Sequence, residues 1–265
     1  MLKIIKDAFK LTNKNLMLVC SLYLFSIVST VYFAFSQVAA NASGQMVILY
    51  CLTMVAFFAG FFNQIKSAVK NEEGKFKFLE GIGDYYLPML GIGLLSLVIY
   101  VIFAEVATLL SAKLVGGSSV LVAAMNKTVE VMQANNFDVS ALDMQALQVV
   151  SIFMLVLWGV WCVVSFVILY WVPVLFFDNE HNIFKSLGRS VVYLFRNFGK
   201  SFLVFLLLLI PVVLLSVLSV AFSSFKIVAV LSNVLVYYVS VAFLFAIFLL
   251  YADRTVEKIE EVEDK

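Results

Sequence analysis

The sequence predicts an all-α fold: a polytopic membrane helical bundle of six transmembrane helices, with cytosolic interfacial amphipathic helices and an external helical hairpin. Three observations lead to this prediction: the composition, the length of the apolar runs and the distribution of Lys and Arg. Of the residues, 63% are hydrophobic and only 13% are charged. A soluble domain has about 45–50% apolar and about 25% charged residues. A globule this apolar could not cover its surface with polar groups, so lipid must be its solvent.

Six apolar runs are long enough to cross a bilayer. A transmembrane helix needs about 20 apolar residues to cross a hydrocarbon core of about 30 Å. Such runs occupy residues 16–38, 46–65, 86–110, 149–176, 201–222 and 227–252. They leave an external segment at 111–148 and a cytosolic tail at 253–265, and we interpret residues 1–265 as a single integral membrane domain. The fourth and sixth runs exceed the length of a span, so we expect them to tilt or to emerge from the bilayer.

Lys and Arg lie mainly on alternate connections between these runs. Fifteen of the 18 fall in segments 1–15, 66–85, 177–200 and 253–265. Only Lys113, Lys127 and Lys226 lie in the other connections. The positive-inside rule then places both termini in the cytosol. We expect a multi-pass protein of the plasma membrane. The net charge of +1 gives no sign of a nucleic-acid partner.

The first apolar run also has features of a cleavable signal peptide, because a basic stretch precedes it and Ala40-Asn41-Ala42 follows it. The apolar region of a signal peptide is about 7–15 residues long, however, and this run is longer than about 20. Its removal would also break the alternation of charge. We therefore expect the first span to be retained.

An amphipathic stretch precedes a pair of spans three times, at residues 2–15, at 76–86 before a break at Pro88, and at 183–200. In the third stretch apolar residues recur at helical spacing, at Ile183, Leu187, Val191, Leu194 and Phe198. Such helices bury an apolar face at the headgroup boundary while basic residues meet anionic lipid, at about 1 kcal/mol per Lys or Arg. The candidate lipid contacts are Arg189, Arg196 and Lys200. Packing beneath the bundle is the alternative, and the two arrangements are compatible.

The external segment contains an amphipathic helix that the three repeats do not share. After a turn-forming Gly-Gly-Ser-Ser stretch, an apolar stripe follows the pattern i, i+4, i+8, i+11, at Leu121, Met125, Val129 and Met132. Residues 135–138 interrupt the pattern, and Ser140 with Asp143 is typical of the start of a second helix. Because an isolated amphipathic helix is not stable in water, the stripe must be covered. We expect contact with lipid or with a membrane or extracytoplasmic protein partner, and packing within the chain is the alternative.

Glu105 is the only acidic residue well inside a predicted span. Intramembrane carboxylates are costly and often functional. Glu105 lies about five residues from the outer end of the span, which is within about 8 Å of the interface at 1.5 Å per residue. It therefore either reaches the outer headgroups or pairs with Lys113, or it forms a buried ion or proton site.

His181 is the only histidine and lies between Glu180 and Asn182. A single His without ordered ligand spacing is a poor metal site, so we expect a solvated turn in which Asp or Asn caps the next helix. The sequence has no His-Glu-x-x-His, Gly-x-Ser-x-Gly or Walker motif. We therefore expect no enzymatic activity, metal or cofactor.

Gly91, Gly93 and Pro211 lie within predicted spans. Small residues let helices approach closely in a membrane, which is the role we expect for the two glycines. Pro211 removes a backbone hydrogen bond near the middle of the fifth span and should kink it.

Two consecutive segments carry a resemblance to known proteins. A span ending with aromatic residues and Pro, from Tyr170 to Phe177, is followed by Asp178-Asn179 and then by a helix with Ser186, Arg189 and Ser190. This pattern resembles uncharacterised bacterial and archaeal six-span membrane families and the membrane domain fused to some glycerophosphodiester phosphodiesterases. The resemblance extends loosely to the stretch around residues 61–64 and Gly81, so that it covers about half of the chain. It implies a helical bundle with cytosolic interfacial helices. It implies no activity, because this chain lacks the phosphodiesterase domain.

Two classes of function fit the sequence. The first is a non-enzymatic membrane protein that organises lipid or binds a partner. The alternative is a transporter or channel-like component that uses the bundle interior. Transporters commonly place paired polar residues and broken helices near the midplane. Only Pro211 and Asn233 approach that pattern, so we favour the first class.

Overall fold

The computed structural model describes residues 2–38, 44–72, 77–134, 144–221 and 225–263, and all regular structure within these ranges is α-helical. The all-α prediction is confirmed. The helices are α1 (Leu2–Lys14), α2 (Leu16–Val38), α3 (Gly44–Val69), α4 (Lys77–Leu114), α5 (Ser118–Ala134), α6 (Met144–Val167), α7 (Trp171–Phe177), α8 (Ile183–Arg196), α9 (Phe198–Ala221) and α10 (Lys226–Glu263).

Among the described residues, five helical stretches are long and apolar enough to cross a bilayer. They are Gln45–Val69, Lys77–Leu114, Met144–Phe177, Phe198–Leu218 and Val230–Asp253. The pair Leu2–Lys14 and Leu16–Tyr32 makes a sixth if it is counted as one span bent by 75°. The chain is therefore a helical membrane protein with several candidate spans.

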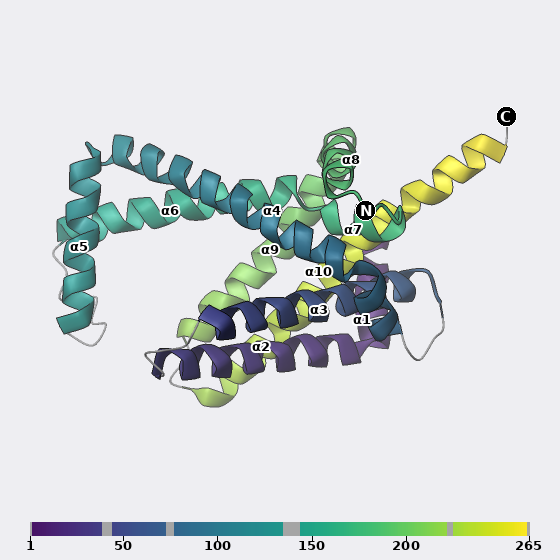
Figure 1. Ribbon diagram of the computed structural model, residues 1–265, viewed down its shortest axis with the longest axis horizontal. Coiled ribbons are helices and arrows are strands. Elements are labelled where there is room, and N and C mark those ends of the chain that lie inside the picture. Colours follow the sequence, from purple (N-terminus) through teal and green to yellow (C-terminus); the bar gives the residue numbers. More distant parts are fainter. Residues whose placement is uncertain (1, 39–43, 73–76, 135–143, 222–224, 264–265) are drawn as a thin grey trace. The chain divides into compact units, whose positions relative to one another are not determined.

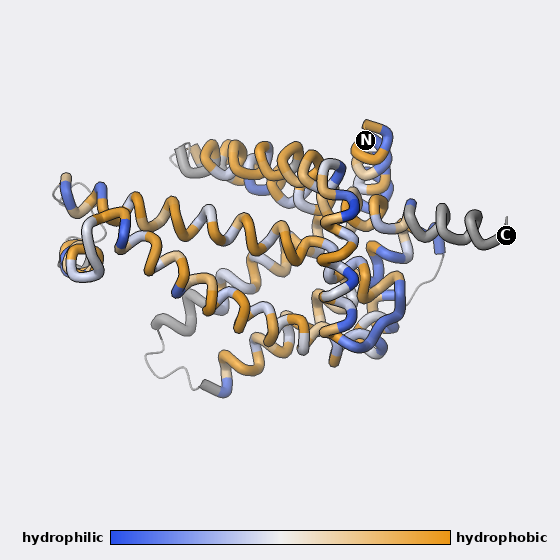
Figure 2. The backbone as a smooth tube through the Cα atoms, turned by 90° about the horizontal axis from the view of Figure 1, so that it is seen from above, coloured by the Kyte–Doolittle hydropathy of each residue, from blue (hydrophilic) through white to orange (hydrophobic). Residues whose placement is uncertain are grey.

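The chain divides into two compact units, which we describe separately: Met1–Ile92 with Ile168–Lys265, and Gly93–Val167. In the first unit α10 is the central helix, because it packs against α1, α2, α3, α7 and α9 (Figure 1). Of its apolar window, 50% is buried, against 17% for α3. Figure 2 shows hydrophilic residues gathered at one end of this unit, while the helices that leave this end are mainly apolar.

Stacked aromatic rings join α2, α3 and α10. The Phe25 ring stacks on Phe57 with the centroids 4.0 Å apart. Further along α3, Phe62 stacks on Phe248 of α10 at 6.2 Å. Aromatic pairs contribute about 0.5–1.5 kcal/mol beyond the area they bury, so these rings fix which faces of the apolar helices meet.

The break that the sequence predicts at Pro88 is absent, because α4 continues through this residue to Leu114. The stretch predicted as a separate amphipathic helix at 76–86 is the first part of α4, apart from Phe76, which lies outside the described residues. A proline costs its helix one N–H bond. About two turns before Pro88, α4 packs closely against α3. A β-carbon at Gly81 would overlap Asn63 Cβ of α3, and Asn63 donates its side-chain N–H to the Lys77 carbonyl at 2.7 Å.

The two glycines predicted to permit close packing differ. A β-carbon at Gly91 would overlap the Ile183 side chain, whereas a β-carbon at Gly93 would have no neighbour within 4 Å. Gly91 therefore marks a close approach, as expected, and Gly93 does not.

The fourth predicted span, 149–176, is interrupted between α6 and α7. Pro173 lies in the first turn of α7, where its missing N–H is tolerated. Its ring would clash with the carbonyl of Leu169 in a continuous helix. The chain instead makes a turn at 168–170, with the Trp171 N–H bonded to the Ile168 carbonyl at 3.0 Å.

The second unit contains the end of α4, then α5 and α6, with α5 joining the other two (Figure 1). Its core is formed by Ala112, Leu121, Ala124, Ala146 and Val149. Within this unit the Tyr100 and Ser165 hydroxyls are 3.0 Å apart and form a hydrogen bond between α4 and α6. The predicted external helix at 121–132 corresponds to α5.

Candidate functional site at the loop between α7 and α8

The loop from Asp178 to Asn182 joins α7 to α8. Asn179 has a φ of 47°, a left-handed conformation that Asn tolerates better than most residues. Asn182 then caps α8, because its side-chain Oδ1 accepts a hydrogen bond from the Lys185 N–H at 3.1 Å. The predicted helix cap is confirmed.

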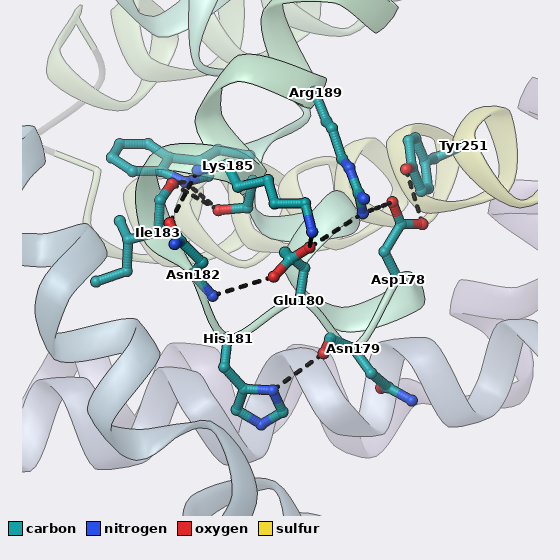
Figure 3. A network of polar contacts seen from close by, with 11 residues as sticks. Asp178, Asn179, Glu180, His181, Asn182, Ile183, Lys185, Arg189 and Tyr251 are labelled. Atoms are coloured by element: carbon teal, nitrogen blue, oxygen red, sulfur yellow. Dashed lines mark hydrogen bonds and ion pairs between the residues drawn. The ribbon is translucent and has the colours of Figure 1, made fainter.

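Both carboxylates of the loop are held by basic residues of α8 (Figure 3). Glu180 Oε2 lies 2.7 Å from Lys185 Nζ and 3.3 Å from Arg189 Nη1. Arg189 Nη1 also lies 3.2 Å from Asp178 Oδ2. The other oxygen, Asp178 Oδ1, accepts a hydrogen bond from the Tyr251 hydroxyl of α10 at 3.0 Å. The two acids of the loop and the two bases of α8 compensate each other, so the ion-pair network has no net charge.

The hydrogen bond from Lys185 is the main cause that lowers the pKa of Glu180, and the charges of Lys185 and Arg189 add to it. Glu180 therefore remains ionised at neutral pH. A carboxylate in this state accepts hydrogen bonds but has no proton to donate, which argues against a role as general acid.

The opposite side of the loop is bound to α3 and α4. Asn179 Oδ1 accepts hydrogen bonds from the Tyr85 hydroxyl at 2.7 Å and from Lys66 Nζ at 3.3 Å. Lys66 also donates to the Tyr85 oxygen at 2.9 Å. The His181 ring is nearly parallel to the Tyr85 ring, with centroids 6.2 Å apart, and its Nδ1 lies 3.0 Å from the Asn179 carbonyl oxygen.

Buried polar contacts fix α8 against its unit. The Trp171 indole N–H donates to Ser186 Oγ at 2.9 Å, and the Tyr193 hydroxyl donates to the Leu250 carbonyl at 2.6 Å. Each such bond contributes about 0.5–1.5 kcal/mol net. Leaving either donor buried without its acceptor would cost more.

The surface of α8 has three sectors. Its buried sector contains Ser186, Ser190, Tyr193 and Leu194. Phe184 and Phe195 are 74% and 66% exposed, and at 100° per residue they lie within about 20° of each other. Lys185, Arg189 and Arg196 share a third sector about 40° wide. The buried sector is thus displaced from the predicted stripe, of which Leu194 alone is buried. Ile183, Leu187 and Val191 are half-buried, and Phe198 is exposed and belongs to α9.

The structure separates the predicted lipid contacts. Arg189 belongs to the ion-pair network of the loop. Arg196 and Lys200 are exposed and form no ion pair with a described carboxylate. Glu105 is exposed on α4 and does not pair with Lys113.

The predicted stripe on α5 is also divided. Leu121 is 1% exposed and lies in the core of its unit, whereas Met125 and Val129 are exposed. The side chain of Met132 lies outside the described residues. Packing within the chain therefore covers Leu121, and it leaves the next two positions of the stripe open.

Sequence reasoning missed the residues that hold the loop in place, above all Lys66, Tyr85 and Tyr251. A partial signal was present, because two acids in the loop are followed by bases at helical spacing in α8. No signal connected the loop to α3, α4 or α10, which are distant in sequence. Among the described residues no cluster of His, Cys, Asp and Glu could hold a metal ion. The ion pairs and hydrogen bonds of Asp178, Asn179 and Glu180 fix the start of α8. We call this network the polar brace.

No known family model, curated protein or solved structure matches this chain.

Proposed function

We propose that this chain is a non-enzymatic, six-span protein of the plasma membrane that organises lipid at the cytosolic face through α8. In this proposal α2 supplies the first span and α1 a cytosolic interfacial helix. The alternation of Lys and Arg supports both termini being cytosolic. The resemblance of residues 170–190 to six-span families with interfacial helices agrees with the same arrangement.

The exposed aromatic sector of α8 is the observation that carries this proposal. Phe184 and Phe195 project from a helix whose opposite side is held by buried hydrogen bonds. The neighbouring sector carries Arg196, and the exposed Lys200 follows the helix. Apolar residues beside basic residues are typical of a helix that lies in the headgroup region of an anionic leaflet.

Depth-dependent fluorescence tests this placement. Single cysteines at positions 184, 195 and 185 are labelled with an environment-sensitive dye, after Cys20, Cys51 and Cys162 have been replaced by Ser. The protein is then reconstituted in vesicles that contain lipids with a quencher on the acyl chain. We expect blue-shifted, quenched emission at 184 and 195 and water-like emission at 185. Water-like emission at all three positions would show that α8 is solvated and would overturn the proposal.

We also propose that α5 contacts a membrane or extracytoplasmic protein partner. Val122, Met125 and Val129 are exposed and lie within about 60° of one another on the helix. They form a face beside the one that packs in the core of the second unit through Leu121 and Ala124. The test of this contact is the final prediction below.

A further inference from the structure

The first unit has a second polar site, a pocket of about 400 Å³ where α1 ends and α2 begins. The end of α3 and the start of α4 complete its wall. Met17 and Phe78 are among its apolar lining residues, and its polar lining residues are Lys14, Asn15, Ser21, Gln64, Ser67, Glu72 and Lys77. None of them belongs to the brace around Asp178.

Three polar groups of this pocket have no partner among the residues that the structure describes. Ser67 is only 4% exposed, yet its hydroxyl forms no hydrogen bond with a described residue. The same holds for the half-buried Gln64 carboxamide, and the Lys14 ammonium forms neither a hydrogen bond nor an ion pair within the described ranges. Lys14 is exposed and Gln64 is half-buried, so both are open to a ligand, and Ser67 lines the same pocket. A ligand that accepts hydrogen bonds from these three side chains would pair donors that no described residue pairs.

The charges of the pocket favour an anion. Lys77 is already paired, with Glu80 at 3.2 Å and with Glu72 at 3.7 Å. Lys14 forms no ion pair with a described carboxylate, and Glu72 of the same lining is paired with Lys77, so the two lysines and one glutamate leave one positive charge. An ammonium, an amide N–H and a hydroxyl in the lining of one pocket match the several acceptor oxygens of a phosphate group.

An apolar stripe on α2 begins at this pocket. The exposed side chains of Met17, Leu24, Val28 and Val31 recur along α2 at helical spacing. At 100° per residue they share a sector about 60° wide. An acyl chain attached to a phosphate in the pocket could follow this sector, whereas a soluble phosphate would make no use of it.

We infer that this pocket binds the phosphate headgroup of an anionic phospholipid, with an acyl chain along the exposed stripe of α2. This inference rests on the proposed membrane orientation, which places the junction of α1 and α2 at the inner headgroup level. The lipid that the protein organises would then be an anionic phospholipid, bound at a site separate from α8.

Lipid binding to the full-length protein in detergent tests the inference by native mass spectrometry. The probes are phosphatidylglycerol, phosphatidylcholine and glycerol 3-phosphate. The variant Lys14→Gln removes the uncompensated charge, and Lys6→Gln removes an exposed charge of the same helix outside the pocket. A charge-assisted hydrogen bond is worth about 1.5–3 kcal/mol. We expect Lys14→Gln to weaken phosphatidylglycerol binding by about tenfold or more, and Lys6→Gln by less than about twofold.

Gln64→Glu provides a second variant of nearly equal shape. Its carboxylate would repel a phosphate, so phosphatidylglycerol binding should be lost while the melting temperature stays close to that of the wild type. Equal loss in Lys14→Gln and Lys6→Gln would reduce the effect to general electrostatics and overturn the inference. Equal binding of phosphatidylcholine and phosphatidylglycerol, or displacement of the lipid by millimolar glycerol 3-phosphate, would also overturn it.

The failures of the two proposals are distinguishable. Water-like emission from dye at positions 184 and 195 with intact, Lys14-dependent lipid binding would contradict the role of α8 alone. Quenched emission at those positions without selective lipid binding would contradict the pocket alone.

Discussion

The Tyr251 hydroxyl donates a hydrogen bond to Asp178 Oδ1 at 3.0 Å, and this contact joins α10 to the loop before α8. The second oxygen of the same carboxylate lies 3.2 Å from Arg189 of α8. Asp178 therefore connects the central helix of its unit to the helix that we propose to lie at the membrane surface. We therefore expect a substitution of Asp178 to change the position of α8 and to lower the stability of the unit.

Replacing Asp178 should destabilise the protein in a graded way. Asp178→Ala removes the acceptor of the Tyr251 hydroxyl and one of the two ion pairs of Arg189, which keeps Glu180 as a partner. We expect a loss of about 1–3 kcal/mol. Tyr251→Phe removes one hydrogen bond and keeps the ion pair, so the loss should be nearer 1 kcal/mol. Thermal unfolding in detergent, followed by circular dichroism, measures both. Equal melting temperatures for Asp178→Ala and the wild type would show that the brace does not stabilise α8.

The low pKa of Glu180 predicts a stability change in acid. Its folded-state pKa lies below the ordinary value of about 4.3. The ionised form is thus favoured by folding, and its contribution is fully present above the unfolded pKa and is lost as the pH falls through the folded pKa. We expect the melting temperature of Glu180→Gln to approach that of the wild type only below about pH 4. Lys185→Gln removes the main cause of the shift and should reduce the same pH dependence, and a constant difference between pH 3 and 7 would contradict the assignment.

The sequence could predict the class of fold because lipid imposes a length and a composition on each span. It could not predict which helices pack together, since spacing within one helix says nothing about its neighbours. The contact between Asn179 and Tyr85 joins residues 94 positions apart. Pro88 and Pro173 show that the position of a proline does not predict whether a helix breaks there. Pro88 lies within a continuous α4, whereas Pro173 follows a break between α6 and α7.

The buried faces of α5 and α8 also differ from the apolar stripes that the sequence predicts. The sequence predicts an apolar stripe on each helix, to be covered by lipid, by a partner or by the chain itself, and helical spacing does not distinguish these. In α8 the buried sector instead contains Ser186 and Ser190, small residues that allow close packing. In a membrane the large side chains can face lipid, so hydropathy alone does not distinguish the inner from the outer face of a helix.

Close packing between α3 and α4 predicts a contrast between two neighbouring glycines. A β-carbon at Gly81 would overlap Asn63 Cβ and lie 2.8 Å from the Ala59 carbonyl oxygen, while one at Gly83 would meet nothing within 4 Å. We expect Gly81→Ala to destabilise the protein by about 1–3 kcal/mol. Gly83→Ala should be neutral or stabilising by up to about 1 kcal/mol, because Ala favours helix. Thermal unfolding of the two variants compares them directly, and equal effects would rule out a close approach at Gly81.

Membrane orientation is tested by cysteine accessibility. Single cysteines at positions 10, 77, 196 and 258 should react with a membrane-impermeant maleimide only after the membrane is opened, because the six-span arrangement places them in the cytosol. A cysteine at position 127 should react in intact cells. Labelling of position 127 from the cytosolic side alone would contradict the six-span proposal.

The exposed face of α5 should be captured by crosslinking. A photo-reactive residue at position 125 replaces a side chain that points away from the core of its unit, while the same residue at position 121 would lie within that core. We expect position 125 to form adducts with lipid or with a second protein, and position 121 to form adducts within the chain. Position 121 is the matched control for position 125, because both lie on α5 and carry the same photo-reactive group under the same irradiation. Val129 is 53% exposed, so position 129 should behave like 125. Adducts confined to the chain at both 125 and 129 would show that other parts of this protein cover the face, and α5 would then be a lid without a partner.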